Sequence, residues 1–495
     1  MDDPTPARLS GRGDSVAGSL GGRQLAALVT GPSGTSAGYR RLAGAISALI
    51  LDGRIAVRVR LPAERELATA LNTSRPTVTA AYDLLRESGY AHSRRGSGTW
   101  TALPEGRTPS GVTRTITLPD SAIDLARAAP GLPEKTLADA LDQIAPRLAQ
   151  HARTPGYHPY GLPEMRAAVA DHFTRRGLAT LPEQILVTSG AQHALTLVLG
   201  LLSGPGDRVM VENPSYPNAL DAMRRARLRP VPVPVTDTGW DIVTTESTLR
   251  EAVPRLAYLI PDFHNPTGLL MPERERVRVL RAAARSGTWL VVDETLAELA
   301  LDVPAPAPFA SHAPPGGAGQ VITIGSMSKT FWGGLRVGWL RAPSGVVTEL
   351  AAQRIANDLG GSVLDQLLAL ALLDRAPELF PSRLAETRER RAALVAALAE
   401  YVPQWSWKVP PGGLSLWVDL GEPIASALTR RALDHGVRVE GGGQFAAAPG
   451  VFEQRLRIPY TQPPERLREA VQRMATALAR GLPAGAAVRG PHFIA

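Results

Sequence analysis

The sequence predicts an α/β protein made of a small N-terminal helical unit and a larger unit with a mostly parallel sheet. Between about residues 124 and 480, short apolar runs of β type alternate with helical stretches, which is typical of parallel strands covered by helices. Before that region, three short helical patterns precede two strand-like segments that flank a glycine-rich turn. The 495 residues suffice for more than one hydrophobic core, so the two patterns indicate separate domains.

Composition restricts the class of protein. The chain has no cysteine, which excludes disulfides, thiolate metal sites and a cysteine nucleophile, and which is compatible with a reducing cytoplasm. The N-terminus lacks the pattern of a secretion signal, and the apolar runs are too short to cross a bilayer. We therefore expect a cytoplasmic protein with no membrane partner. The net charge of +8 is concentrated in residues 1–110, where 14 arginines face nine acidic residues, and this asymmetry suggests an anionic polymer as partner.

The small unit is expected over residues 35–101. Apolar residues at helical spacing predict a first helix that ends near Asp52, a second from about residue 63 to 71, and a third from about 76 to 89. A short hairpin then turns at residues 94–98. Three helices followed by such a hairpin predict a winged helix-turn-helix, whose third helix can lie in the major groove of DNA.

The other segments follow from composition. Residues 1–34 are rich in glycine and serine and are expected to be flexible, with a short helix near their end. Residues 102–120 carry the proline, glycine and threonine of an interdomain linker. The large unit then spans residues 121–480, and residues 481–495 form a tail rich in small residues.

Three segments of the small unit carry a more specific pattern. Residues 61–68, 74–78 and 95–99 closely resemble the DNA-binding domain of GntR-type transcription regulators. The resemblance implies double-stranded promoter DNA as a partner, and arginine suits bidentate contact with phosphate or guanine. The alternative is that these arginines only decorate solvated helix faces. The residues that would contact phosphates, base edges or the minor groove are Arg65, Ser74, Arg75, Thr77, Arg95 and Gly96.

Lys329 is one of only three lysines in the chain. It lies on the turn after the predicted strand at residues 321–324, seven residues before Arg336. A lysine amine can form an imine with an aldehyde, and an arginine can hold a phosphate group as a planar fork. An aldehyde and a phosphate together describe pyridoxal 5′-phosphate (PLP). The alternative is that a surface lysine and a surface arginine are neighbours by chance.

Further polar blocks end other predicted strands. The segment at residues 187–192 ends a strand and opens a helix, so its backbone N–H groups and the helix dipole can hold a phosphate. Tyr216 offers an aromatic face, and Asn265 follows another strand. Asp293 ends a third strand, and a buried carboxylate keeps a pyridine nitrogen protonated so that the ring can withdraw electrons. Taken singly, each residue could be a turn, a strand-end cap or a core aromatic.

In this order the blocks resemble fold-type I PLP enzymes, the aspartate aminotransferase superfamily, over about residues 124–480. The resemblance implies that Lys329 forms the imine, Asp293 contacts the pyridinium, Asn265 contacts the ring hydroxyl and Tyr216 stacks on the ring. It also implies a set of phosphate contacts. These are Gly190, Ala191, Gln192, Ser326, Ser328 and Arg336.

The C-terminal segment at residues 455–460 resembles the strand whose arginine binds the α-carboxylate of the substrate. Arg457 is our choice for that role, and Arg455 is the rival.

Two departures from the family pattern reduce the expectation of fast transamination. Many relatives have a tyrosine shortly after the pyridinium aspartate, where this chain has Thr295 and Leu296. Thr295 could substitute, although an aliphatic hydroxyl is a poorer acid than a phenol. The second departure concerns the tyrosine that a neighbouring subunit supplies to the phosphate in the family. Tyr157 and Tyr160 are both candidates for it.

The whole chain resembles MocR-type regulators, in which a GntR-like DNA reader is joined to an aminotransferase-like domain. This resemblance implies a homodimeric transcription regulator whose aldimine-bound PLP at Lys329 senses an amino compound, or PLP itself, and modulates promoter binding. Two alternatives remain. The chain could be a working aminotransferase with an accessory DNA-binding domain, or a DNA-binding dimer that keeps only the scaffold of the cofactor site.

Overall fold

The computed structural model describes residues 19–29, 38–52, 54–57, 59–94, 98–102, 121–314, 317–448 and 450–479. These residues divide into two compact units, one within residues 1–108 and one within residues 109–495. The proposed wing residues Arg95 and Gly96 lie outside the described residues, as do nearly all of the linker and the tail. Within the described parts, no helix is long and apolar enough to span a bilayer.

The N-terminal unit has the three predicted helices and the hairpin, preceded by one further helix. The Ser74 hydroxyl caps the last helix, because it accepts a hydrogen bond from the Thr77 backbone N–H at 3.3 Å. The helix and strand boundaries confirm the predicted elements to within about two residues. The elements are α1 (Gly22–Val29), α2 (Tyr39–Leu51), α3 (Glu64–Ala70), α4 (Arg75–Glu87), β1 (Ala91–Arg94) and β2 (Gly98–Thr101).

One core holds this unit together. Ile46 of α2 and Val78 of α4 are fully buried, and the Tyr82 hydroxyl donates to the Pro62 carbonyl at 2.9 Å. Leu25 of α1 is buried in the same core. The short helix that the sequence predicts near the end of residues 1–34 is therefore present as α1, and the packing of Leu25 holds it in this core.

An eight-stranded sheet forms the centre of the large unit, with strand order β4-β11-β10-β9-β8-β5-β6-β7. The pairs from β10 through β9, β8 and β5 to β6 are parallel, whereas β11 and β7 run antiparallel to their neighbours. The predicted mostly parallel sheet is confirmed. The strands are β4 (Ile185–Thr188), β5 (Arg208–Asn213), β6 (Arg229–Thr236), β7 (Gly239–Trp240), β8 (Leu256–Leu259), β9 (Trp289–Asp293), β10 (Val321–Ser326) and β11 (Gly338–Arg341).

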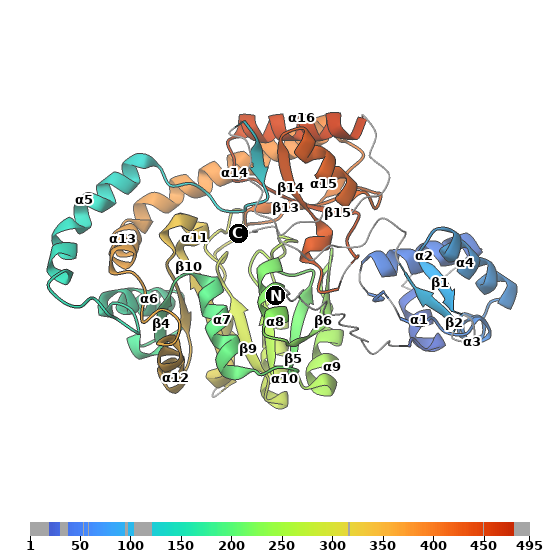
Figure 1. Ribbon diagram of the computed structural model, residues 1–495, viewed down its shortest axis with the longest axis horizontal. Coiled ribbons are helices and arrows are strands. Elements are labelled where there is room, and N and C mark those ends of the chain that lie inside the picture. Colours follow the sequence, from blue (N-terminus) through green and yellow to red (C-terminus); the bar gives the residue numbers. More distant parts are fainter. Residues whose placement is uncertain are drawn as a thin grey trace, which may run out of the picture. The chain divides into compact units, whose positions relative to one another are not determined.

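Helices cover this sheet, and Figure 1 shows α7, α8, α9 and α10 lying against its strands. Strands β4, β8 and β10 are buried along their whole length, which agrees with their mostly apolar sequence. The helices are α5 (Glu134–His151), α6 (Pro163–Arg175), α7 (Ala191–Leu202), α8 (Pro217–Arg225), α9 (Ile242–Ala252), α10 (Glu273–Ser286), α11 (Met327–Thr330), α12 (Ser344–Arg354) and α13 (Val363–Asp374).

A five-stranded sheet with order β12-β13-β15-β14-β3 forms a smaller subdomain of the same unit. Figure 1 shows α14, α15 and α16 gathered around β13, β14 and β15. A second core of leucine, valine and alanine side chains fills the space between these helices and strands. The elements are β3 (Ile123–Leu125), α14 (Ala376–Tyr401), β12 (Ser406–Trp407), β13 (Ser415–Asp419), α15 (Ala425–Asp434), β14 (Val437–Gly441), β15 (Arg455–Pro459) and α16 (Pro464–Ala479).

This topology determines where a site can form. The strands β4, β5, β8, β9 and β10 all point in one direction, so their carboxyl ends meet at one edge of the large sheet. Ligands of open α/β sheets bind at that edge. The polar blocks that the sequence analysis selected follow these strand ends.

Candidate functional site

Lys329 lies directly after β10, in the single turn of α11. Its Nζ atom donates a hydrogen bond to the Ala128 carbonyl at 3.0 Å. Burial, followed by the positive charge of Arg457, lowers the pKa of Lys329 to about 7, although the negative charge of Asp293 opposes this. A large fraction of the amine is therefore neutral near pH 7, which is the form that attacks an aldehyde.

Asp293 ends the neighbouring strand β9 and is buried. Each of its oxygens accepts one hydrogen bond, Oδ2 from the Tyr258 hydroxyl at 2.7 Å and Oδ1 from the Thr295 backbone N–H at 3.0 Å. The negative charge of Asp293 acts to raise the pKa of both Lys329 and Tyr216. Tyr258, which reaches Asp293 from β8, was not among the residues predicted for the site.

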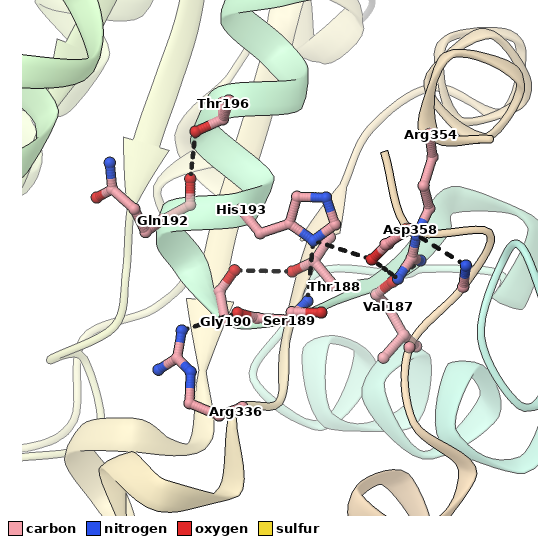
Figure 2. Close-up of polar contacts among 12 residues, drawn as sticks. Val187, Thr188, Ser189, Gly190, Gln192, His193, Thr196, Arg336, Arg354 and Asp358 are labelled. Carbon is pink, nitrogen blue, oxygen red and sulfur yellow. Dashed lines mark hydrogen bonds and ion pairs between the residues drawn. The ribbon is translucent and has the colours of Figure 1, made fainter. Parts of the chain in front are cut away.

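The turn between β4 and α7 forms a cradle with Arg336. Gly190 has φ +91°, and a Cβ atom there would lie 2.8 Å from Nη2 of Arg336. This positive φ favours glycine over residues with a side chain. The Arg336 Nη2 atom donates to the Ser189 carbonyl at 2.9 Å, and Figure 2 shows the guanidinium directed at this turn. The first backbone N–H groups of α7 and a guanidinium therefore face one place, which suits an anion.

The side chains of His193, Arg354 and Asp358 stabilise the cradle. Figure 2 shows His193 between the Ser189 turn and Asp358. The Ser189 backbone N–H donates to His193 Nδ1 at 3.2 Å, and Asp358 Oδ2 lies 3.6 Å from the same nitrogen. Burial lowers the pKa of His193, which favours the neutral ring that can accept this bond. Arg354 is fully buried and donates to Asp358 Oδ1 at 2.6 Å and to the Val187 carbonyl. The sequence pattern does not predict this group, because His193 is far in the chain from Arg354 and Asp358.

The remaining predicted cofactor contacts lie at the same sheet edge. Burial raises the pKa of Tyr216 to about 12, and its hydroxyl accepts a hydrogen bond from Asn218 at 2.7 Å. The Ser326 hydroxyl, at the end of β10, lies 2.9 Å from the Ser328 hydroxyl. Asn265 follows β8, and its Oδ1 atom is buried with no hydrogen-bond partner among the described residues.

Arg457 and Arg455 lie on β15 but have different surroundings. Arg457 is fully buried, donates through Nη2 to the Ala126 carbonyl, and has two further nitrogens, Nε and Nη1, buried without a hydrogen-bond partner among the described residues. Burial lowers the pKa of Arg457 to about 10, and the charge of Glu440 opposes that shift. Arg455 instead pairs with Asp237 at 2.8 Å and Asp419 at 3.2 Å. Arg457 therefore keeps donors for a ligand carboxylate, and Arg455 is already engaged.

In the N-terminal unit, the described candidate residues lie on α3 and the first turn of α4. Arg65, Ser74 and Arg75 are exposed, and Thr77 is partly buried beneath the Ser74 cap. Arg75 has one weak ion pair, with its Nε atom 3.6 Å from Glu64 Oε2. An exposed pair of this kind is worth little, so both guanidiniums are available to another partner.

Comparison with known proteins identifies both units. Residues 122–474 match the family aminotransferase class I and II, and residues 38–100 match the gntR family of bacterial regulatory proteins. The chain is 32% identical over 403 residues to the probable rhizopine catabolism regulatory protein MocR of Rhizobium meliloti, covering 74% of this chain and 78% of that protein. The chain belongs to the MocR-type transcription regulators.

The large unit of this MocR-type regulator is also similar to solved aminotransferases. LysN, an α-aminoadipate aminotransferase from Thermus thermophilus solved with N-(5′-phosphopyridoxyl)-L-leucine, is 32% identical with a TM-score of 0.67. The match covers 73% of this chain and 93% of that chain. A kynurenine aminotransferase from Pyrococcus horikoshii is 27% identical with the same TM-score, and the match covers 74% of this chain and 92% of that one. These likenesses indicate PLP as the cofactor of the large unit.

The residues of this regulator fit that cofactor. Around the sheet edge, the buried polar atoms without a hydrogen-bond partner among the described residues include Gln192 Oε1, Ser215 Oγ and Asn265 Oδ1. A buried polar atom without a partner is costly, so such a cluster suits a polar ligand. The Gly190 cradle suits its phosphate, and the Lys329 amine suits its aldehyde.

Thr295 and Leu296, the two positions at which the chain departs from the family pattern, have different surroundings. Leu296 is buried in a small apolar cluster with Phe263 and Leu299. Thr295 is partly buried and contacts Asp293 through its backbone N–H. Leu296 therefore supplies packing in place of a phenol hydroxyl.

A cavity of about 420 Å³ opens beside Lys329. Residues 129–133 and helix α14 contribute its walls, together with residues 461–463. Arg390 of α14 donates to Glu386 at 3.0 Å within this wall. The cavity leaves space for a small molecule to approach Lys329.

Proposed function

We propose that this regulator holds PLP covalently at Lys329, senses an amino compound or PLP itself at that site, and changes its binding to promoter DNA accordingly. The single observation that supports this most is the Lys329 amine at the carboxyl end of β10, with its pKa lowered to about 7, close to Asp293, Arg336 and Arg457. When bound, PLP supplies an aldehyde that exchanges between amines and a ring that withdraws electrons.

Each residue of the site would hold a different part of this cofactor. Asp293 would hold the proton on the pyridine nitrogen, Asn265 would bind the ring hydroxyl and Tyr216 would stack on the ring. The phosphate would lie in the cradle of Gly190 and Arg336. The other proposed phosphate contacts are Ala191, Gln192, Ser326 and Ser328.

Arg457 would select ligands that carry a carboxylate. Its Nε and Nη1 atoms lack a hydrogen-bond partner among the described residues, and a buried guanidinium with spare donors is suited to bidentate carboxylate binding. An incoming amino acid would displace the Lys329 amine while Arg457 holds its carboxylate. This division of roles predicts that amino acids act more strongly than amines of similar size.

We infer that the regulator is a homodimer whose cofactor sites lie at the subunit interface. Tyr157, Ile355, Leu359 and Leu364 are exposed apolar side chains, with Tyr157 68% exposed. Gly360 packs against the backbone of His158, because a Cβ atom at Gly360 would lie 2.8 Å from the His158 carbonyl oxygen. Tyr157 is the better candidate to reach a partner's phosphate, since Tyr160 is partly buried beneath Arg166.

DNA binding would use the N-terminal unit. Arg65, Ser74, Arg75 and Thr77 lie at the start of α4 and on α3, which is the part of a helix-turn-helix that meets bases and phosphates. Arg95 and Gly96 would bring the wing to the DNA backbone. A regulator of chromosomal promoters would act in the cytoplasm.

A second function, transamination, is favoured by the likeness to LysN. Leu296 argues against fast turnover, because it leaves the ring hydroxyl without the phenol that relatives often supply there. Steady production of keto acids without binding to DNA would favour the enzyme over the regulator.

The test uses the purified full-length protein loaded with PLP. Its visible absorption is recorded with a panel of α-, β- and γ-amino acids, and its affinity for a double-stranded fragment from upstream of its own gene is measured with and without each amine. We expect at least one amine to change both the spectrum and the DNA affinity, and neither change in Lys329→Ala. Wild-type protein that stays colourless with added PLP would contradict the proposal.

A further inference from the structure

Tyr258 and Asp293 lie on the same face of neighbouring parallel strands. In the register of β8 with β9, Tyr258 is opposite Val291, two residues before Asp293. Side chains two residues apart on a strand share a face, so the phenol extends diagonally toward the carboxyl end of β9. Its hydroxyl donates to Asp293 Oδ2 at 2.7 Å, the length of a strong O–H···O⁻ bond.

The environment keeps this phenol a hydrogen-bond donor. Tyr258 is 1% exposed, and its ring packs in the core between the large sheet and its helices. Burial, followed by the negative charge of Asp293, raises the pKa of Tyr258 well above its ordinary value. The hydroxyl therefore remains protonated across the physiological range of pH.

The donors around Asp293 determine where its carboxylate points. A buried carboxylate needs hydrogen bonds to remain charged, and here Tyr258 and the Thr295 backbone N–H each serve one oxygen. The backbone donor belongs to the turn that follows β9, whereas the phenol is fixed in the sheet core. A Tyr258→Phe substitution would therefore remove one of these donors and keep the aromatic ring in the core.

We propose that Tyr258 is the positioning residue of the cofactor site, which orients the Asp293 carboxylate toward the pyridine nitrogen of PLP. This inference rests on the proposed function, because it requires PLP at Lys329.

The main test compares Tyr258→Phe with Tyr460→Phe. Both side chains are buried tyrosines of the large unit, but the Tyr460 hydroxyl donates to a backbone carbonyl, that of Gly412, at 3.0 Å. For each variant, thermal unfolding of the apoprotein, the dissociation constant for PLP and the pH dependence of the bound cofactor's absorption are measured. These last two quantities respond to the pyridine nitrogen, whereas a purely structural hydroxyl changes only the unfolding.

Tyr258→Phe is expected to weaken PLP binding by about tenfold or more, since it removes a buried hydrogen bond to a charged group. It should also shift the pH at which the bound cofactor's absorption changes, because the carboxylate left with one donor holds the ring proton differently. Tyr460→Phe should leave both quantities close to those of the wild type, because its hydroxyl bonds the Gly412 carbonyl and not Asp293. Equal PLP affinity in Tyr258→Phe and wild type would overturn the proposal.

A double-mutant cycle separates an effect through Asp293 from a general loosening of the site. If Tyr258 acts through Asp293, Tyr258→Phe should have little further effect on PLP affinity once Asp293→Asn is present. Additive losses would overturn the proposal, as would unfolding of the Tyr258→Phe apoprotein. A wild type that binds no PLP would instead refute the proposed function itself.

Discussion

The two units use their functional residues in opposite ways. In the DNA-binding unit, Arg65 and Arg75 are exposed and the core forms without them. In the cofactor unit, Asp293 and Arg457 are buried, and burial also lowers the pKa of Lys329. The DNA-contacting surface can therefore change without affecting stability, whereas the cofactor site is part of the packing that holds its fold. Substitutions in the two units should therefore separate binding from stability.

The largest expected effect comes from Lys329→Ala. This variant should lose the covalent colour of bound PLP and any response of DNA affinity to amines, while DNA binding without effector remains. Spectra and DNA titrations check both. The matched control is Lys135→Ala, whose exposed amine pairs with Asp139 at 3.1 Å on the surface and which should behave like the wild type. Loss of the response in both variants would show that the effect is not specific to the site.

The next effect is the pH dependence of PLP capture by the apoprotein. Because the pKa of Lys329 is lowered from 10.5 to about 7, the rate should rise about tenfold per pH unit below neutrality and level off above pH ~8. An ordinary lysine would have about a thousandfold less free amine at pH 7. Between about pH 7 and 10.5, folded Lys329 binds fewer protons than the unfolded chain, so its contribution to stability rises with pH. Stopped-flow absorption measures the rate, and a rate still rising steeply at pH 10 would exclude the lowered pKa.

Arg75→Ala should weaken DNA binding by roughly tenfold to a hundredfold and leave the melting temperature unchanged. The guanidinium is exposed and has only its weak pair with Glu64, so the fold does not depend on it. Fluorescence anisotropy against salt concentration gives the affinity, and calorimetry gives the stability. Arg285→Ala, an exposed arginine on α10, controls for the loss of one positive charge. Equal losses in the two variants would argue against a specific role of Arg75.

The smallest effect is on stability. Asp358→Asn should lower the free energy of unfolding by about 1–3 kcal/mol, because it leaves the buried Arg354 guanidinium without its charged partner. It should also weaken phosphate binding, since His193 and the Ser189 turn lose their support. Glu246→Gln breaks a bidentate pair with Arg278 of similar length on the surface and should cost much less. Similar losses from the two variants, measured by urea unfolding, would contradict the role of burial.

Much of the fold was predictable because strand ends carry local signals. Asp293 and Lys329 each follow an apolar run that becomes a buried strand, and parallel strands bring such ends together. Tyr258 could not be assigned, because its contact with Asp293 depends on the register between β8 and β9. The support of the cradle by Arg354 likewise joins residues far apart in the chain. The choice between Arg455 and Arg457 also needed the pairing of β13 with β15, which places Asp419 opposite Arg455.

Covalent trapping shows directly whether PLP is attached to Lys329. The PLP-loaded protein is reduced with borohydride, digested and analysed by mass spectrometry, and the chain offers only three lysines as attachment sites. We expect a stable phosphopyridoxyl adduct on Lys329. An adduct confined to Lys135 or Lys408, or no adduct at all, would contradict it.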